Sequence, residues 1–262
     1  MAAGYDQHWA PVLRPSATAL LERLEGEVRS GARELLDVGV GTGNLTIPAL
    51  ARWPDVRVTG VDPSREMINA VDALVRERLP AAIDRFAGHV AYAAEMPFDD
   101  GAFDVAMSSF VLQLVPKRAV ALREIRRVLR PGGTLVFVTW LKDARLFEPD
   151  RVFDTLLDEF GFDEEPDEPR SGDIPTVERA AAELRRAGFR DVAASRESLD
   201  HAFTVDGYIA FLTEFDEESL FDEMDRTERR RFLRTFRERL MALEPDALRF
   251  RVPIVYASGR RP

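Results

Sequence analysis

Apolar positions in the first 140 residues follow two alternating patterns. Five short runs are apolar almost without interruption, which is typical of strands buried on both faces. They cover residues 34–40, 56–62, 89–94, 103–111 and 134–140. Between them, apolar residues recur at helical spacing over 15–30, 44–53, 64–79 and 116–129. Because strands and helices alternate and crossovers are right-handed, we predict an α/β fold with a doubly wound, Rossmann-like parallel sheet.

The second half of the chain has a different pattern. Residues 158–175 are acidic and broken by prolines, which predicts a mobile surface loop. We expect a helix over 177–189, a strand with its exit loop over 190–205, helices over 206–243 and a last strand over 248–261. The two late strands would complete a seven-stranded, mostly parallel sheet and place a helical cap insertion over one edge. In the first helix, Pro15 is expected in the first turn, where proline is tolerated.

Composition narrows the range of partners. The 262 residues include 36 Lys and Arg against 46 Asp and Glu, a formal net charge of −10. Such a surface repels phosphate backbones and anionic lipid, so we expect no nucleic-acid and no membrane partner. The basic stretch 228–239 lies beside the acidic residues 216–225 and is interpreted as a solvated helix with salt links.

Further classes of site are excluded or not expected. The chain has no cysteine, which excludes disulfides and zinc–thiolate sites. No cluster of histidine and carboxylate residues indicates a metal. The first residues lack a signal-peptide pattern, and no apolar run approaches the roughly 20 residues of a membrane span. We therefore expect a cytoplasmic protein, and a homodimer is compatible with these observations.

A glycine-rich loop follows the first strand. Gly39, Gly41 and Gly43 stand at alternate positions, where they allow a sharp turn and a close approach of backbone to a ligand. A phosphate-binding Walker loop needs Gly-Lys-Ser/Thr, which is absent. The dinucleotide fingerprint G-x-G-x-x-G is absent too, because Asn44 and Thr46 stand where its third glycine belongs.

Two carboxylates flank this loop. Asp37 ends the first strand, and Asp62 ends the second. A carboxylate beside the loop would repel a pyrophosphate and favour an ammonium or sulfonium group. Asp62 is placed to accept hydrogen bonds from two ribose hydroxyls. Together they favour an adenosine ligand that carries positive charge in place of phosphate.

This ordered set matches a known family. The chain resembles the class I S-adenosylmethionine-dependent methyltransferases, particularly the small-molecule branch (methyltransferase type 11) similar to enzymes of quinone biosynthesis. The matching segments, in order, are LLDVGVGTGNLT (35–46), VTGVDPSREMI (58–68), EMPFDDGAFDVAMSSFVLQLV (95–115) and LREIRRVLRPGGTLVFVTW (122–140). The resemblance implies a methyltransferase whose cofactor is S-adenosylmethionine.

The resemblance also implies roles for individual residues. Asp37 would pair with the amino-acid part of the methyl donor, Asp62 would bind the ribose hydroxyls, and the three loop glycines would bring backbone against the donor. Further positions around the donor are Pro63 and Met67 on the adenine side, Glu95 and Met96 near the adenine ring, and Ser108, Ser109 and Phe110 where the donor faces the acceptor.

The sequence departs from the family pattern at two places. Tyr92 and its neighbours stand where relatives often have an acidic residue at the end of the third strand, which puts the adenine contact in doubt. Gln113 stands where many relatives carry a histidine, which removes one candidate base.

On this basis the chain is divided into five parts of one structural domain. They are an N-terminal helical segment (1–33), an S-adenosylmethionine-binding core (34–141), a linker with a helix and the sixth strand (142–205), a helical cap (206–247) and the last strand (248–262).

Methyl transfer is an in-line displacement with a neutral leaving group, so alignment supplies much of the acceleration and a base is needed only for a weak acceptor. Weak candidates for a base are His8, His201, Tyr5 and Glu214. The aromatic and apolar residues of the cap would roof the cavity and favour a small, hydrophobic or aromatic acceptor. The alternatives are a non-catalytic donor-binding protein, a nucleic-acid or protein methyltransferase and a nicotinamide oxidoreductase; the charge of −10 disfavours nucleic acid, and the loop spacing disfavours nicotinamide.

Overall fold

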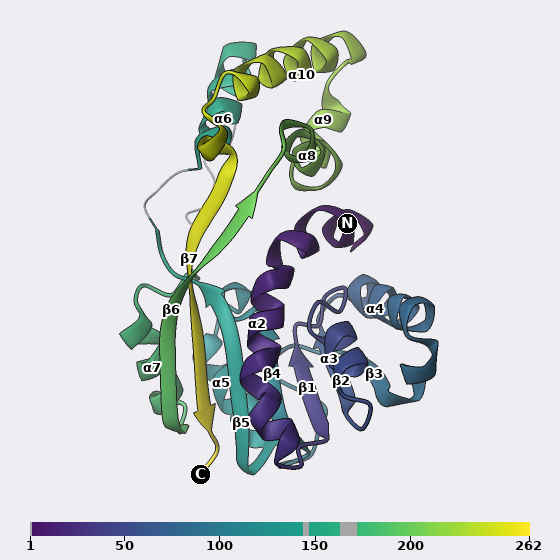
Figure 1. Ribbon diagram of the computed structural model, residues 1–262, viewed down its shortest axis with the longest axis vertical. Coiled ribbons are helices and arrows are strands. Elements are labelled where there is room, and N and C mark those ends of the chain that lie inside the picture. The colour runs from purple at the N-terminus through teal and green to yellow at the C-terminus, as the bar shows by residue number, and fades with distance from the viewer. Residues whose placement is uncertain (1, 144–146, 163–171) are drawn as a thin grey trace.

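A single seven-stranded sheet forms the centre of the computed structural model, which describes residues 2–143, 147–162 and 172–262 (Figure 1). The strand order is β3-β2-β1-β4-β5-β7-β6. The strands are β1 (Glu34–Val38), β2 (Arg57–Asp62), β3 (Phe86–Val90), β4 (Phe103–Ser109), β5 (Leu129–Trp140), β6 (Arg190–Ala202) and β7 (Arg249–Arg260). All neighbouring pairs from β3 to β5 are parallel, and β7 is antiparallel to both β5 and β6. The predicted seven-stranded, mostly parallel sheet is confirmed.

Helices cover both faces of this sheet. The helices of the described residues are α1 (Ala2–Gly4), η1 (Tyr5–Trp9), α2 (Ala10–Arg29), α3 (Thr46–Arg52), α4 (Arg65–Arg78), η2 (Pro80–Arg85), η3 (Leu112–Leu114), α5 (Arg118–Val128), α6 (Glu148–Phe160), α7 (Val177–Arg186), α8 (Val205–Phe211), η4 (Leu212–Asp216), α9 (Glu218–Glu223), α10 (Arg226–Met241) and η5 (Pro245–Leu248). Helices α2, α3 and α4 lie on one face, and α5 and α7 lie on the other. Alternate residues of β1 enter two separate cores, as the strand period of two requires. Leu35 packs with α2, α3 and α4, and Leu36 packs with α5 and α7.

The order of strands reverses beside β1. The chain runs from β1 outward to β2 and β3, then returns to place β4 on the other side of β1. In an open α/β sheet, ligands bind at the carboxyl ends of the strands next to this switch. The loops after β1, β2 and β4 are therefore the expected walls of a site.

Several predicted boundaries are wrong. The first helix, α2, begins at Ala10 because Val12 and Leu13 are buried and extend its apolar face, so Pro15 lies inside the helix and not in its first turn. The third strand is Phe86–Val90 and not 89–94, because Phe86 is buried and Tyr92 forms an isolated bridge with Glu95. Helix α6 was not predicted, and its last residues occupy the start of the predicted loop 158–175. Residues 163–171 of that loop lie outside the described residues.

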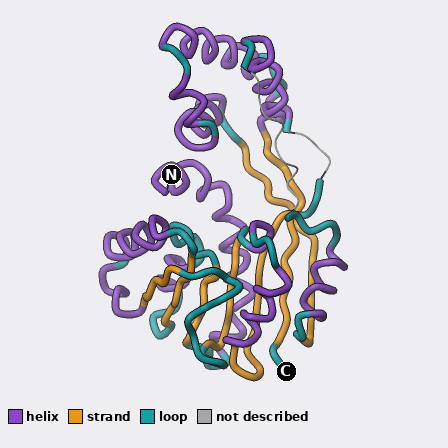
Figure 2. The backbone as a smooth tube through the Cα atoms, turned by 180° about the vertical axis from the view of Figure 1, so that it is seen from behind, coloured by secondary structure: helices purple, strands orange, loops and turns teal. Residues whose placement is uncertain are grey.

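A separate aromatic core forms the cap. Helices α6, α8, α9 and α10 pack around Phe153, Tyr208, Phe221, Phe232 and Phe236, all of them buried. Strands β6 and β7 continue beyond the sheet and lead into this layer, so the cap stands over the carboxyl ends of the parallel strands (Figures 1 and 2). Of the helices in the described residues, none is both long and apolar enough to cross a membrane.

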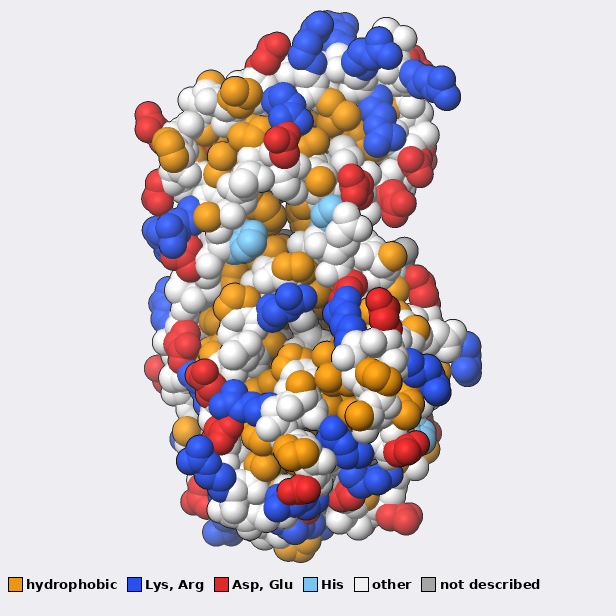
Figure 3. Space-filling model, turned by 45° about the vertical axis from the view of Figure 1, so that its right-hand side comes forward, with side chains coloured by type: hydrophobic (Ala, Val, Ile, Leu, Met, Phe, Trp, Pro, Cys, Tyr) orange, Lys and Arg blue, Asp and Glu red, His pale blue; other side chains and the backbone are white. Residues whose placement is uncertain are grey.

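The basic stretch in the cap lies on α10. Asp225 caps this helix by accepting hydrogen bonds from the N–H groups of Thr227 and Glu228, at 2.7 and 2.9 Å. Arg237 pairs with Asp206 of α8, and Arg239 pairs with Glu159 of α6. Basic side chains accordingly gather at the cap end of the molecule in Figure 3. The predicted solvated helix with salt links is found here.

Candidate functional site

The glycine loop is held by close contacts as well as by backbone angles. Gly39 has φ +74° and Gly41 has φ +51°, both in the left-handed region that disfavours side chains. A Cβ placed on Gly39 would lie 2.2 Å from a methyl carbon of Val111, so that position has no room for a side chain. A Cβ on Gly41 would meet only the Tyr5 ring, at 3.9 Å. Gly39 thus joins the loop to the end of β4, while Gly41 faces open space.

Asp37 is a buried carboxylate beside this loop. It is 2 % exposed, and it accepts a hydrogen bond from Thr46 Oγ1 at 2.7 Å. Burial, assisted by the nearby charge of Asp62, raises the pKa of Asp37 to about 7. Because its negative charge is costly where it stands, a positively charged ligand group beside it would stabilise the ionised form.

Asp62 is fixed by backbone on both sides. Its Oδ2 accepts a hydrogen bond from the Gly41 N–H at 3.1 Å, and its Oδ1 accepts one from the Ser64 N–H at 2.9 Å. Each carboxylate oxygen has a second lone pair, so two positions stay free for a pair of neighbouring hydroxyls. This arrangement is compatible with the predicted binding of ribose hydroxyls by Asp62, which stays a prediction.

One cavity of about 760 Å³ joins this region to the cap. That volume lies in the upper part of the roughly 300–1,000 Å³ range of small-molecule sites, which gives room for two ligands. Of the predicted residues, Tyr5, Asp37, Gly39, Gly41, Asp62, Met67, Ser109 and Phe110 line it. Thr42 is a further lining residue, and the hydroxyl oxygens of Thr42 and Ser109 are buried without a hydrogen-bond partner within the described residues.

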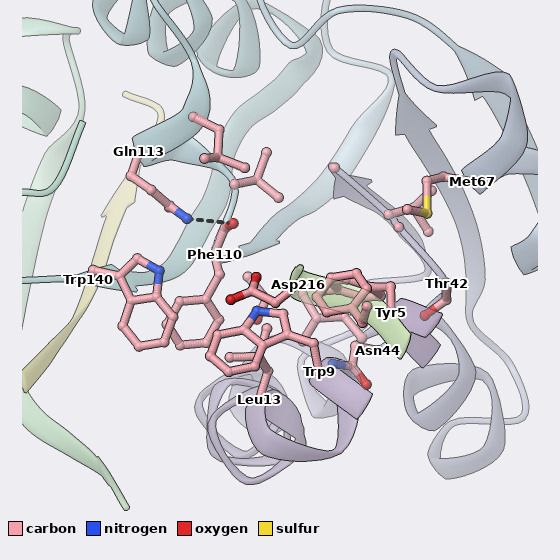
Figure 4. Close-up of a pocket in the computed structure, with 18 of the residues that line it drawn as sticks. Tyr5, Trp9, Leu13, Thr42, Asn44, Met67, Phe110, Gln113, Trp140 and Asp216 are labelled. Carbon is pink, nitrogen blue, oxygen red and sulfur yellow. Dashed lines mark hydrogen bonds between the residues drawn. The ribbon is translucent and has the colours of Figure 1, made fainter. Parts of the chain in front are cut away.

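The rest of the cavity wall is aromatic. The Phe110 ring lies 4.2 Å from that of Trp140 (Figure 4). The wall continues through three further ring contacts. The ring centroids are 6.4 Å apart for Trp140 and Phe250, 5.4 Å for Phe250 and Phe147, and 5.5 Å for Phe147 and Tyr208. All five rings line the cavity, so an aromatic wall runs from the end of β4 to the cap.

Phe110 ends β4 in an unusual backbone conformation. Its φ of +54° is rare for a bulky residue, and it explains why the predicted strand 103–111 stops at Ser109. The Gln113 Nε2 donates a hydrogen bond to the Phe110 carbonyl at 2.7 Å (Figure 4). Thr139 Oγ1 donates one to Gln113 Oε1 at 2.5 Å. Gln113 therefore holds the backbone at the strand end.

The candidate bases differ in their position relative to the cavity. Tyr5 lines the cavity, and burial together with the charges of Asp62 and Asp37 raises its pKa to about 12, so it is a poor base at neutral pH. His8 is not among the lining residues, and its Nε2 lies 3.0 Å from Glu214 Oε2. His201 also lies outside the lining set; its ring packs on Phe203 at 4.6 Å, and burial lowers its pKa.

Five residues predicted to contact the donor do not line the cavity. These residues are Gly43, Pro63, Glu95, Met96 and Ser108. Ser108 is buried and donates a hydrogen bond to the Val38 carbonyl at 2.8 Å, which ties β4 to β1. Tyr92 is 71 % exposed. The roles predicted for these residues toward a donor stay predictions.

The structure adds lining residues that the sequence did not indicate. Trp140 was assigned only to a strand, although its place at the carboxyl end of β5 was a usable signal. Asp150, Phe147 and Phe250 come from segments whose relation to the cavity depends on the cap. Within the described residues, no group of three or more His or carboxylate side chains could hold a metal ion.

Comparison with known proteins identifies a family for the part of the chain that contains this site. Residues 36–137 match the family model described as a methyltransferase domain. This chain contains a class I S-adenosylmethionine-dependent methyltransferase domain. The matched segment runs from β1 through β5 and so includes the glycine loop, Asp62 and Phe110.

Individual relatives support the same assignment. The demethylmenaquinone methyltransferase of Chlorobaculum tepidum is 35 % identical over 133 residues, which are 51 % of this chain and 49 % of the relative. The chain thus spans about half the length of the curated relatives it matches.

Solved structures share the fold at low sequence identity. The phosphoethanolamine N-methyltransferase 2 of Haemonchus contortus, solved with S-adenosylhomocysteine, has TM-score 0.56 and 19 % identity, covering 95 % of this chain and 52 % of that one. The [4+2]-cyclase SpnF has TM-score 0.57 and 20 % identity, covering 94 % and 81 %. Since these neighbours carry different names, the fold alone does not fix the reaction.

Proposed function

We propose that the whole chain is an S-adenosylmethionine-dependent methyltransferase acting on the oxygen, nitrogen or carbon of a small, hydrophobic or aromatic acceptor. One observation carries this proposal: a single cavity has Asp37, Asp62 and the glycine loop at one end and a wall of aromatic rings at the other. A donor and an acceptor can thus meet in the same cavity, beside Phe110.

The donor end fits the cofactor by charge and by hydrogen bonding. Asp37 would face the ammonium and sulfonium part, since burial makes its own charge costly without a cation. Asp62 would accept hydrogen bonds from the two ribose hydroxyls. When bound, the donor supplies an activated methyl group with a neutral leaving group.

The acceptor end supplies alignment and exclusion of water. The aromatic wall gives a flat apolar acceptor large contact areas. Among the predicted bases only Tyr5 lines the cavity, and its pKa of about 12 makes it a hydrogen-bond donor at neutral pH. We therefore assign most of the acceleration to alignment of acceptor and donor, a contribution of order 7–11 kcal/mol in favourable cases.

The proposal also covers the type of substrate, the cellular location and the oligomeric state of the protein. A formal net charge of −10 disfavours nucleic acid as the substrate, and we propose a small-molecule acceptor in the cytoplasm. A homodimer stays a prediction. The alternative is a protein that binds the donor without turnover.

Turnover decides between these two proposals. Purified protein is incubated with methyl-labelled S-adenosylmethionine and a panel of phenols, quinols, naphthols and aromatic amines, and labelled product and S-adenosylhomocysteine are measured together. We expect both to appear in equal amounts with at least one acceptor. The Asp62→Ala variant, which loses charge-assisted hydrogen bonds, should reduce kcat/KM by roughly 10- to 100-fold. Donor binding without transfer to any acceptor would support the non-catalytic alternative.

A further inference from the structure

The cap end of the cavity holds a carboxylate and a phenol bonded to each other. Asp150 is the third residue of α6, and Tyr208 is on α8. The Tyr208 hydroxyl donates a hydrogen bond to Asp150 Oδ1, and both residues line the cavity. Tyr208 belongs to the aromatic cap residues predicted to roof the cavity, whereas Asp150 was not indicated by the sequence.

The orientation of this pair is set from both sides. The Tyr208 side chain is 1 % exposed and packs against the rings of Phe147, Phe203 and Phe211 at 5.5, 5.4 and 6.1 Å. Asp150 stands in the first turn of a helix, where the helix dipole stabilises a negative charge. Burial and the neighbouring carboxylate of Asp150 raise the pKa of Tyr208 above its usual range. Tyr208 therefore stays the donor, and Asp150 stays the acceptor.

The pair lies at the opposite end of the cavity from the donor residues. Four ring-to-ring contacts separate Phe110, which ends β4, from Tyr208 in the cap. Asp37 and Asp62 end β1 and β2 in the sheet, whereas α6 and α8 belong to the cap layer above it (Figure 1). A molecule that spans the wall meets the methyl donor at one end and Asp150 at the other.

We propose that Asp150, positioned by Tyr208, is a distal subsite that accepts a hydrogen bond from a hydroxyl or amino group of the methyl acceptor. The acceptor class is then an elongated aromatic or polycyclic molecule with a hydrogen-bond donor at the end remote from the methylated atom. This inference rests on the proposed function and names its substrate class. An acceptor with such a group gains a charge-assisted hydrogen bond that a purely apolar ligand cannot make, so the subsite favours the former.

Two other polar side chains of the cavity are less suited to this role. The Gln113 amide is already engaged by Phe110 and Thr139. Asp216 comes from η4, the same π-helical turn as Phe215, whose ring contacts Tyr5 at 5.9 Å. Figure 4 shows the Asp216 carboxylate in the part of the cavity lined by Trp9 and Tyr5. Asp216→Asn is therefore a control for charge: the Asp216 carboxylate also contributes to the raised pKa of Tyr208, but its removal leaves the Tyr208–Asp150 hydrogen bond in place.

The test compares two ligands that differ in one hydroxyl. Binding of 2-naphthol and 2,7-dihydroxynaphthalene is measured by fluorescence titration in the presence of saturating S-adenosylhomocysteine. We expect the wild type to prefer the diol by roughly 10-fold, Asp150→Ala to lose this preference, and Asp216→Asn to keep it. Tyr208→Phe should reduce the preference, because the carboxylate loses the group that orients it. If Asp150→Ala does not fold, Asp150→Asn, which keeps the shape and removes the charge, replaces it.

Outcomes for the subsite and for the proposed function are separate. Calorimetry of S-adenosylhomocysteine on each variant should give unchanged affinity. Three results overturn the subsite when S-adenosylhomocysteine binds: the wild type shows no preference for the diol, the Asp150 variants keep that preference, or neither naphthol binds. If S-adenosylhomocysteine fails to bind the wild type, the proposed function fails, and the naphthols titrated alone then decide whether an Asp150-dependent site exists without it.

Discussion

Gln113 Nε2 lies 2.7 Å from the carbonyl oxygen of Phe110, the residue whose φ of +54° ends β4 at the cavity. A bulky residue in this region costs of order 1–3 kcal/mol and persists only where the surroundings hold it. The amide of Gln113, itself fixed by Thr139, supplies such a restraint. The ring that separates the donor end from the aromatic wall is thus positioned by a side chain that does not need to touch either ligand.

The first prediction concerns this restraint. In Gln113→Ala, the Phe110 carbonyl loses its hydrogen bond, and we expect KM for the acceptor to rise roughly 5-fold, as one lost hydrogen bond of about 1 kcal/mol implies. Donor affinity should change little, since the hydrogen bonds of Gln113 go to Phe110 and Thr139 and not to Asp37 or Asp62. Steady-state kinetics with both substrates varied gives the two values.

Controls for this prediction lie at the neighbouring positions. Thr139→Ser keeps the hydroxyl and should behave as wild type, whereas Thr139→Val should resemble Gln113→Ala. A general loss of kcat with unchanged KM in Gln113→Ala would show that the amide does not act by positioning.

The second prediction concerns the loop glycines. Gly39→Ala places a Cβ 2.2 Å from a Val111 carbon, at φ +74°, so strain and overpacking add. We expect the free energy of unfolding to fall by about 2–4 kcal/mol. Gly41→Ala, with φ +51° and only Tyr5 within 4 Å, should lose about 1 kcal/mol from strain alone. Urea unfolding of both variants measures the difference, and equal losses would contradict the close contact with Val111.

The third prediction follows from the raised pKa of Asp37. Its ordinary value is 3.8, and in the folded protein it is about 7. Between these values the folded state binds more protons than the unfolded state, so this group makes stability fall as pH rises from about 4 to about 7. Asp37→Asn, which stays uncharged, should remove that part of the pH dependence.

Urea unfolding at pH 5 and pH 7.5 checks this sign. The wild type should lose more stability than Asp37→Asn over that interval, and the difference isolates Asp37 from other titrating groups. S-adenosylmethionine should reduce the wild-type loss, because its positive charge stabilises the ionised carboxylate. Identical losses in the two proteins would mean that Asp37 is ionised at an ordinary pKa in the fold.

The sheet could be predicted from the sequence because its signals are local. Continuous apolar runs such as 34–40 mark strands buried on both faces, and the Ser64 cap of α4, which accepts the Met67 N–H, is a local hydrogen bond. Strand ends were less certain, because they depend on distant contacts. The end of β4 is set by Gln113 and Thr139, which no periodicity reveals.

The donor side of the cavity could also be predicted from the sequence. Asp37 and Asp62 lie at the carboxyl ends of β1 and β2, and Gly39 and Gly41 lie in the loop that follows β1, so strand order alone brings them together. The acceptor side could not be predicted in this way. Asp150 belongs to a helix that was not predicted, and it reaches the cavity only because α6 packs against α8 and α10 in the cap.

The most direct test of the central claim is calorimetric binding of S-adenosylhomocysteine to the wild type, with NAD as the competing ligand. Asp62→Ala is measured beside Asp72→Ala, which removes a carboxylate that pairs with Arg76 on the surface of α4. We predict micromolar binding of S-adenosylhomocysteine, no binding of NAD, roughly 10- to 100-fold weaker binding in Asp62→Ala, and no change in Asp72→Ala. If S-adenosylhomocysteine does not bind, or binds equally well without the Asp62 carboxylate, the glycine loop and its two acids are not a methyl-donor site.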